Sequence, residues 1–461
     1  MSPNAGTTIF ADQALLPDGW AENVAVRFAQ DGLITEVQPG ARSAPSQIRV
    51  STLLPAPVNL HSHAFQRAMA GMSERKGTEQ TDSFWTWRQI MFRFLDMLTP
   101  EDVEAIAAFV QMEMLEAGYA AVGEFHYLHH QHGGAPYDNL AEMSERICAA
   151  ADQTGIGLTH LPVLYTYGGC DKRALAAGQV RFGNDFNRFH KLRDGAARAM
   201  RHLPSDTVLG VAPHSLRAVD EDGLRQAVAL AGDKPLHMHL AEQVAEVEEV
   251  EAARGMRPVE WLLDQHRVGS NWCLIHCTQM TPEETGALAR TRAVAGLCPI
   301  TESSLGDGIF DGVRYLGAGG RFGIGSDSNI RISLSEELRT LEYSQRLRDK
   351  VRASVATAEK STGRVLFDAA VRGGAQAAGR RSGKMEAGCF ADLVTLDPTA
   401  IDLDGLRGDA ILDAYIFAGD DRMVQDVWAA GRHVVAGGYH VKRDAIRARY
   451  RSTMAALRAR L

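Results

Sequence analysis

Eight apolar, β-prone runs recur through the middle of the chain, and stretches with helical patterning separate them. Two of the helical stretches open on Thr-Pro-Glu, a helix-start signal, at residues 99–101 and 281–283. Eight strands that alternate with helices are typical of a (β/α)8 barrel, an α/β fold. The expected strands cover residues 54–60, 119–126, 157–165, 207–213, 235–240, 271–275, 293–297 and 322–326. The expected helices include residues 100–117, 221–231, 243–254 and 281–290.

Both ends of the chain have a different character. Near the start, residues 24–28 and 33–37 have strand patterning, and the link between them contains Gln30-Asp31-Gly32, a hairpin turn signal. Near the end, residues 391–396 and 424–430 have strand patterning, and residues 431–433 have that of a turn. We therefore expect a small β-sandwich domain built from residues 1–56 and 385–461, and a barrel over residues 57–384.

Composition excludes several classes of protein. The 461 residues are 45% hydrophobic and carry a net charge of -8, which favours a globular chain and argues against a nucleic-acid partner. No stretch approaches the roughly 18 apolar residues of a membrane span, and residues 1–20 lack the pattern of a signal peptide. The six cysteines include no C-x-x-C pair, which favours a reduced, cytoplasmic protein.

Histidines and one aspartate stand at the ends of the expected strands, where such barrels carry their chemistry. His61 and His63 are two apart on an extended segment, so both side chains leave one face and a single metal ion can take both. His239 lies nearer its strand end than His237, which we expect to be hydrogen-bonded deeper in the barrel. Asp327 completes the set. Three imidazoles and one carboxylate favour Zn²⁺, with Fe²⁺ and Mn²⁺ left open.

The end of the fourth expected strand bears on the number of metal ions. Many barrel hydrolases hold two metals bridged by a modified lysine at this point. Here residues 211–217 read Val-Ala-Pro-His-Ser-Leu-Arg and contain no lysine. This favours one divalent metal ion per subunit.

Two further groups have more than one interpretation. Glu242 is placed to carry protons beside a metal-bound water, and it is also the first acidic residue before an expected helix, where negative charge is stabilising. Both roles are compatible. His276 either orients the water or a developing charge, or is a satisfied core histidine.

Taken together, these segments resemble the amidohydrolase superfamily in its branch of mononuclear deaminases. The resemblance covers nearly all of the chain and implies a metal-dependent hydrolase. It rests on the split β-domain, His61-x-His63, residues 239–242, His276, Ser326-Asp327 and residues 388–397. The metal ligands that it implies are His61, His63, His239 and Asp327, and the proton-handling residues are Glu242, His276 and Asp327.

Three segments, residues 61–67, 84–91 and 298–308, carry a narrower resemblance to formimidoylglutamate deiminases. That family hydrolyses N-formimino-L-glutamate to N-formyl-L-glutamate and ammonia in histidine degradation. Nucleoside and guanine deaminases of the branch typically have a Ser-Asn pair after Cys-Pro, where this chain has Thr301-Glu302-Ser303. The difference disfavours a purine substrate.

The narrower resemblance also implies contacts to a small dicarboxylate substrate. Arginines suit that role because guanidinium pairs bidentately with carboxylate. Arg88 falls in a segment with the pattern of a lid, although a surface helix arginine is the alternative. The implied substrate contacts are Gln66, Arg88, Tyr127, His214 and Arg217. To the remaining histidine cluster we assign no second metal but exposed or loop-bridging roles: His126, His129, His130 and His132.

The sequence leaves two other functions open. One is another deaminase on the same barrel, for a guanine or adenosine derivative, or a chlorohydrolase-like enzyme, which an ammonia-release assay distinguishes. Another is a non-catalytic binding or scaffold barrel, which metal analysis tests; the full set of ligands argues against it. Because dimers are common for this architecture, we expect a homodimer.

Overall fold

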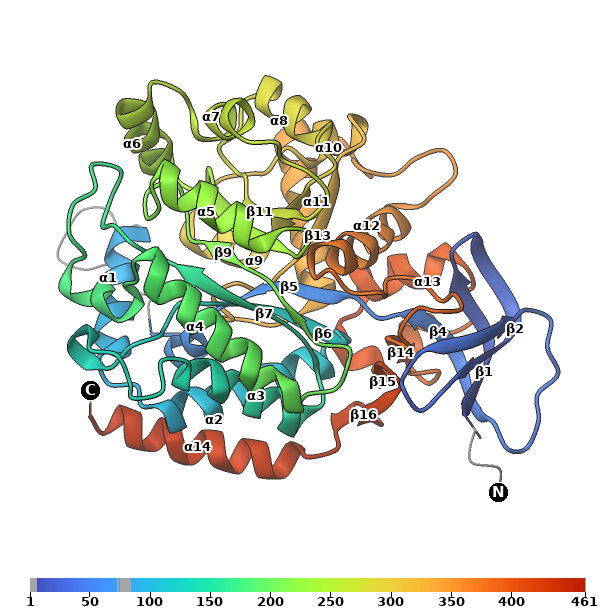
Figure 1. Cartoon of the computed structure of the whole chain (residues 1–461). Coiled ribbons are helices and arrows are strands. Elements are labelled where there is room, and N and C mark those ends of the chain that lie inside the picture. Colours follow the sequence, from blue (N-terminus) through green and yellow to red (C-terminus); the bar gives the residue numbers. More distant parts are fainter. Residues whose placement is uncertain (1–5, 73, 75–83, 461) are drawn as a thin grey trace.

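The computed structural model describes residues 6–72, 74 and 84–460, and for residues 84–89 it describes the backbone alone. Its centre is a ring of parallel strands (Figure 1). One sheet runs from β5 to β8, with β9 paired to β7, and a second runs from β10 to β13. Bridges between Ser62 and Asp327 and between Val211 and Leu236 join the two sheets at both seams. The ring confirms the expected (β/α)8 barrel.

The barrel strands agree closely with the expected ones. Their bounds are β5 Val58–Ser62, β6 Ala121–His126, β7 Gly157–Leu164, β8 Val208–Leu209, β9 Ala212–Pro213, β10 Leu236–Leu240, β11 Trp272–His276, β12 Val294–Leu297 and β13 Arg321–Ile324. The expected first strand is wrong in its bounds, because residues 54–60 join the end of one strand, β4 (Ile48–Pro55), to β5. The chain passes between sheets at Ala56 and Pro57, and both strands are apolar there.

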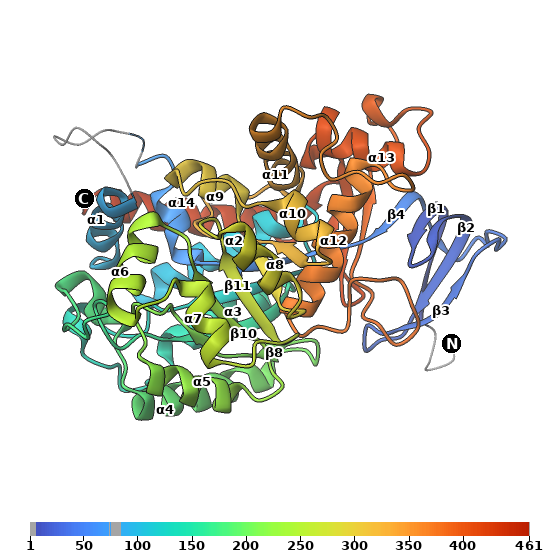
Figure 2. The ribbon, with the colours of Figure 1, turned by 90° about the horizontal axis from the view of Figure 1, so that it is seen from above.

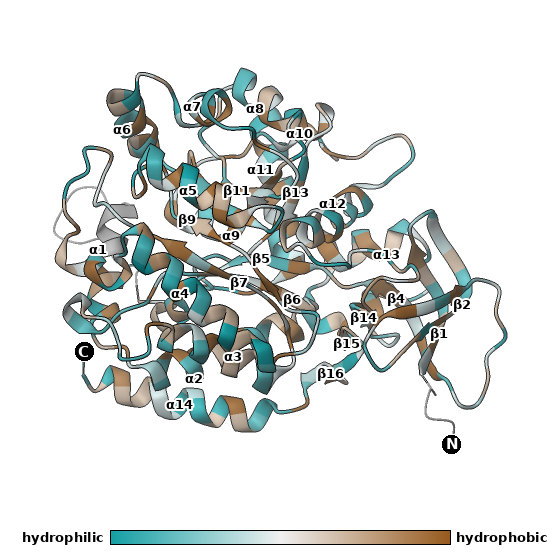
Figure 3. Ribbon diagram, in the orientation of Figure 1, coloured by the Kyte–Doolittle hydropathy of each residue, from teal (hydrophilic) through white to brown (hydrophobic). Residues whose placement is uncertain are grey.

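Helices surround the ring (Figures 1 and 2). Thr99 and Thr281 each accept a hydrogen bond at a helix start, and each forms the capping box that the sequence signal indicates. The bounds are α1 Phe84–Leu95, α2 Pro100–Glu116, α3 Glu142–Thr154, α4 Phe186–Ala199, α5 Glu221–Ala231, α6 Val244–Arg254, α7 Pro258–Gln265, α8 Pro282–Ala289, α9 Pro299–Leu305, α10 Gly312–Gly317, α11 Leu334–Asp349, α12 Thr362–Ala377 and α13 Asp409–Asp413. Hydrophobic residues concentrate on the central strands, whereas the helices carry mixed faces (Figure 3).

The two ends of the chain build one eight-stranded sheet. Its order is β17-β16-β15-β14-β4-β1-β2-β3, so the antiparallel pair of β14 with β4 joins the ends. The remaining bounds are β1 Thr7–Leu16, β2 Gly19–Phe28, β3 Ile34–Gln38, β14 Leu393–Leu396, β15 Val424–Ala429, β16 Arg432–Ala436 and β17 Tyr439–His440. The expected turn at residues 431–433 is displaced, since Arg432 and His433 already belong to β16. The boundaries at residues 56 and 385 stay predictions.

A C-terminal helix, α14 (Arg443–Arg458), has no counterpart among the expected elements. It leaves the sheet and lies along α2 of the barrel (Figure 1). Tyr450 stacks on Phe109 with ring centroids 3.9 Å apart, and Arg449 Nη1 lies 2.6 Å from Glu104 Oε1. The helix therefore ties the end of the chain to the barrel. Among the described residues, no helix combines the length and the apolar character needed to cross a membrane.

A buried ion cluster connects the barrel to the terminal sheet. The Arg380 side chain is 1% exposed, and its guanidinium lies 2.6 Å from Asp392 and 2.7 Å from Asp206. Removal of one partner from a buried pair typically costs about 3–5 kcal/mol, because the remaining charge is uncompensated. We expect Arg380→Ala to lower the unfolding temperature clearly in a thermal melt.

The matched control is Arg422→Ala, because that side chain is 91% exposed beside Asp420. Surface changes of this kind stay within about 0.5 kcal/mol. Equal melting temperatures for the two variants would contradict the structural role of Arg380.

Candidate functional site

Three histidines and an aspartate converge at the carboxyl ends of the strands. His61 lies in β5, His63 directly after it, His239 in β10 and Asp327 just beyond β13. One ligand atom from each lies within 4.8 Å of the others. The close approach needs a glycine, since a Cβ at Gly325 would lie 2.7 Å from the His61 Cβ.

Backbone carbonyls orient two of the imidazoles. His63 Nδ1 lies 2.9 Å from the Phe125 carbonyl oxygen, and His239 Nδ1 lies 3.1 Å from the His214 carbonyl oxygen. A carbonyl only accepts, so each Nδ1 carries the hydrogen and each Nε2 presents a lone pair to the centre. His239 Nε2 is 3.2 Å from His61 Nε2, and His63 Nε2 is 3.1 Å from Asp327 Oδ1. Such inward-facing lone pairs beside a carboxylate fit a divalent cation.

The electrostatics of the site agree with ligand function. Burial lowers the pKa of His61 to about 3 and that of His239 well below its usual value, so both rings are neutral near pH 7. Burial alone would raise the pKa of Asp327, but the close approach of the His61 and His63 rings holds it well below the usual range. Neutral imidazoles with an ionised carboxylate are the protonation states that metal coordination requires.

Glu242, two residues beyond β10, and His276, at the end of β11, face the same centre. His276 Nε2 lies 3.7 Å from Glu242 Oε1 and 3.9 Å from Asp327 Oδ2. Burial, with a smaller contribution from the Asp327 charge, raises the pKa of Glu242 to about 7 despite the opposing effect of His276. A carboxyl group that titrates near neutrality can both accept and donate a proton at working pH.

The backbone is strained at the same strand ends. Ala241 has φ 51°, His276 φ 72° and Asp327 φ 45°, in the left-handed region that L-residues rarely adopt. Each such residue costs on the order of 1–3 kcal/mol and persists only where its surroundings enforce it. Strain of this kind clusters at functional sites.

A narrow cavity of about 50 Å³ adjoins these groups. Gln66, Tyr127, His214 and Arg217 line it together with His63, His239, Glu242, His276 and Asp327. Gln66 Nε2 donates to the Tyr127 hydroxyl at 2.6 Å, while its Oε1 has no hydrogen-bond partner among the described residues. The structure therefore brings together four of the five expected substrate contacts. The fifth, Arg88, falls in α1, where the side chains of residues 84–89 lie outside the described part.

The other histidines singled out in the sequence lie apart from the converging donors. His237 is fully buried, and its Nε2 lies 2.8 Å from the Ala377 carbonyl oxygen, as expected for a residue deeper in the barrel. His129 and His130 bridge segments through the carbonyl oxygens of Val163 and Gly183. His132 is exposed near Asp96, as expected. The expectation is wrong for His126, which is buried beside His129 because it ends β6, a barrel strand covered on both faces.

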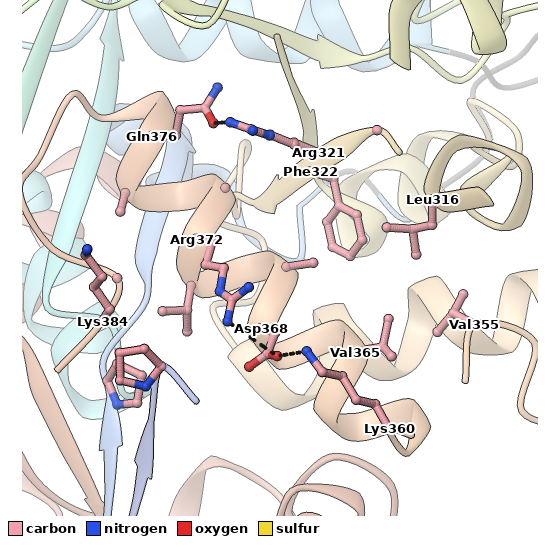
Figure 4. Close-up of a pocket in the computed structure, with 18 of the residues that line it drawn as sticks. Leu316, Arg321, Phe322, Val355, Lys360, Val365, Asp368, Arg372, Gln376 and Lys384 are labelled. Carbon is pink, nitrogen blue, oxygen red and sulfur yellow. Dashed lines mark hydrogen bonds and ion pairs between the residues drawn. The ribbon is translucent and has the colours of Figure 1, made fainter. Parts of the chain in front are cut away.

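A larger cavity, of about 960 Å³, lies away from this chemistry (Figure 4). Arg321, which begins β13, is on its wall, so the cavity belongs to the amino end of that strand. Apolar side chains such as Leu316, Phe322 and Val365 line it, and Lys360 pairs with Asp368 at 2.7 Å. None of the candidate site residues whose side chains the structure describes lies on its wall.

One buried group was not singled out by sequence reasoning as a site residue. Glu302 Oε1 lies 3.2 Å from His276 Nδ1, on the side of the ring opposite the centre. The sequence signal for this contact is the segment Thr301-Glu302-Ser303, which by itself indicates only a difference in substrate.

Comparisons with known proteins agree with this geometry. The family model "Amidohydrolase family" matches residues 52–434, and the model "Formimidoylglutamate deiminase HutF, N-terminal domain" matches residues 6–50. A formimidoylglutamate deiminase of Pseudomonas aeruginosa is 47% identical over 436 residues, which cover 94% of this chain and 96% of that protein. A 5-methylthioadenosine/S-adenosylhomocysteine deaminase of Natronomonas pharaonis is 27% identical over 85% of this chain and 81% of its own.

Solved structures extend the likeness to three dimensions. An amidohydrolase from Brucella melitensis superposes with a TM-score of 0.94 at 48% identity, covering 98% of this chain and 99% of that one. An adenosine deaminase from Xanthomonas campestris with bound zinc gives a TM-score of 0.81 at 22% identity, covering 98% of both chains, and so shares the fold.

Proposed function

The chain belongs to the amidohydrolase family, and on that premise we propose that it hydrolyses N-formimino-L-glutamate to N-formyl-L-glutamate and ammonia, a step of histidine degradation. The observation that carries the proposal is the 47% identity, over nearly the whole chain, to a formimidoylglutamate deiminase. The cluster of His61, His63, His239 and Asp327 supports a metal-dependent reaction.

These four residues are the proposed ligands of one Zn²⁺ ion per subunit. Their support is the donor set itself, since three nitrogens and one carboxylate oxygen suit zinc. The ion would polarise a coordinated water and lower its pKa to about 7.

Protein side chains carry the remaining chemistry. Asp327 and His276 orient the attacking water and accept its proton. As the water oxygen bonds to the formimino carbon, the π electron pair of the C=N bond moves to nitrogen, which Glu242 protonates. The hydroxyl proton then passes through Glu242 to the same nitrogen, the C–N bond breaks with its electron pair leaving as ammonia, and the C=O bond of the formyl amide forms. The pKa of about 7 for Glu242 suits a group that gives and takes a proton in one cycle.

The substrate is a small dicarboxylate, and its two carboxylates call for two cationic partners. Arg217 and Arg88 are the proposed clamps, because guanidinium groups bind carboxylates bidentately. Arg217 is 7% exposed and lines the cavity, which supports its half of the clamp. Gln66, Tyr127 and His214 complete the proposed contacts. A homodimer in the cytoplasm remains part of the proposal, and six free cysteines agree with a reducing compartment.

A substrate panel tests the proposed function. Purified protein is incubated with N-formimino-L-glutamate, guanine, adenosine and 5-methylthioadenosine, and ammonia release is measured for each. We expect release from N-formimino-L-glutamate, with N-formyl-L-glutamate formed in equal amount. Faster release from one of the purine compounds would overturn the proposal in favour of a nucleobase deaminase.

The clamp makes a separate prediction. Truncation of one partner in a buried charge pair costs about 2–5 kcal/mol. Arg217→Ala should therefore lower kcat/KM for N-formimino-L-glutamate by roughly 30- to 5,000-fold, since each 1.4 kcal/mol is worth about a factor of ten. Formamidine, which lacks carboxylates, should lose far less. Both values come from ammonia release.

The control is Arg225→Ala in α5, whose side chain is 65% exposed. It should leave both substrates unaffected. Equal losses on both substrates in Arg217→Ala would contradict the carboxylate clamp.

A further inference from the structure

The first turn of α9 lies between His276, at the end of β11, and Asp327, in the loop after β13. Glu302 is 5% exposed, and its Oε1 accepts hydrogen bonds from His276 Nδ1 at 3.2 Å and from the Cys298 backbone N–H at 2.8 Å. Because a carboxylate only accepts, His276 carries its hydrogen on Nδ1. The Nε2 edge of the ring thereby faces Glu242 and Asp327.

The neighbouring Thr301 forms hydrogen bonds with the loop that carries Asp327. It is 1% exposed, and its Oγ1 lies 2.9 Å from Ser328 Oγ and 3.3 Å from the Ser326 carbonyl oxygen. These two serines flank Asp327 on either side. Two adjacent residues of α9 therefore contact the two groups separately. Glu302 contacts the His276 imidazole, and Thr301 contacts the segment that carries the Asp327 carboxylate.

Strain explains why such support is needed. His276 and Asp327 both have a positive φ, of 72° and 45°. A strained backbone relaxes unless the surrounding contacts prevent it. The contacts of Glu302 with the His276 ring and of Thr301 with the serines beside Asp327 supply such constraints.

None of Thr301, Glu302 and Ser303 is among the residues that line the cavity, and Ser303 is exposed. Their effect on the reaction is therefore through other side chains. We propose that Thr301 and Glu302 are positioning residues, which fix the His276 imidazole and the Asp327 carboxylate relative to each other. The inference rests on the proposed function, because it assigns support for the same reaction.

Kinetics of variants test the proposal. Loss of a hydrogen-bond partner that orients a metal-ligating histidine typically costs about 10- to 100-fold in activity, and we take the same scale for His276. We expect Glu302→Ala to lower kcat by that factor, with KM and metal content unchanged. Glu302→Gln keeps an acceptor oxygen and should lie between Glu302→Ala and the wild type. Thr301→Val, which removes the hydroxyl at nearly constant shape, should also lower kcat and leave KM unchanged.

The matched controls are Ser303→Ala and Ser304→Ala, on the exposed face of the same helix. Both should retain wild-type kcat. A double-mutant cycle adds a readout that general loss of stability would not produce: in a His276→Ala background, Glu302→Ala should cost nothing further. A full additional loss in that background, or identical activity of Glu302→Gln and Glu302→Ala, would overturn the assignment.

A crystal structure of Glu302→Ala tests the positioning without any assay. The proposal expects the His276 ring to rotate or its backbone to leave the left-handed region. An unchanged His276 would overturn it, whatever the enzyme acts on. If instead the wild-type protein releases no ammonia from N-formimino-L-glutamate while the ring does move, the proposed function fails and the positioning role stands.

Discussion

Replacement of Glu242 by glutamine should lower kcat for N-formimino-L-glutamate by about 10²- to 10⁴-fold, the usual worth of a positioned acid or base. Glutamine keeps the shape of the side chain but cannot transfer a proton. The ligands His61, His63, His239 and Asp327 are untouched, so metal content should equal that of the wild type. Stopped assays of ammonia and metal analysis of the same preparation measure both quantities.

Glu248→Gln is the control for this experiment. Glu248 lies on the exposed face of α6, the helix that follows Glu242, so the same chemical change there should leave kcat unaffected. Near-normal turnover in Glu242→Gln, or loss of its metal, would contradict the role of Glu242 in proton transfer.

The second large effect concerns the metal ligands. His239→Ala removes one of the four converging donors, and we expect the purified variant to hold much less metal than the wild type. Turnover should fall by at least about 10³-fold, because charge stabilisation by a bound metal is worth several kcal/mol. Metal analysis and ammonia release measure the two losses.

His237 offers a matched comparison on the same strand. It lies two residues before His239, and its ring bonds to the Ala377 carbonyl oxygen, away from the converging donors. His237→Asn should lower the melting temperature but retain the metal. A variant at His237 that loses metal while His239→Ala keeps it would reverse the assignment of the two histidines.

The sequence predicts the barrel and the converging residues well, for a physical reason. Parallel barrel strands are buried on both faces, so each appears as a short apolar run, and His61, His239 and Asp327 stand at or near the ends of such runs. All of these ends meet at one mouth. Convergence of residues far apart in the chain therefore follows from the strand pattern alone.

Other features depend on contacts that the pattern does not contain. The sequence does not show where β4 ends and β5 begins, because residues 53–60 are apolar apart from Asn59. The α14 helix is rich in arginine and has few buried residues, such as Ile446 and Met454. Its apolar face is recognisable only once the helix packs against α2. The contact of Glu302 with His276 spans 26 residues and requires the left-handed turn at His276, which no local residue preference indicates.

We propose that one metal ion per chain supports deimination of N-formimino-L-glutamate. It is tested most directly by removing the metal with a chelator and titrating Zn²⁺ back while ammonia release is measured. We expect no turnover without metal, a rise in proportion to bound zinc, and a plateau at one ion per chain. Full activity in the metal-free protein, or a plateau at two ions per chain, would contradict it.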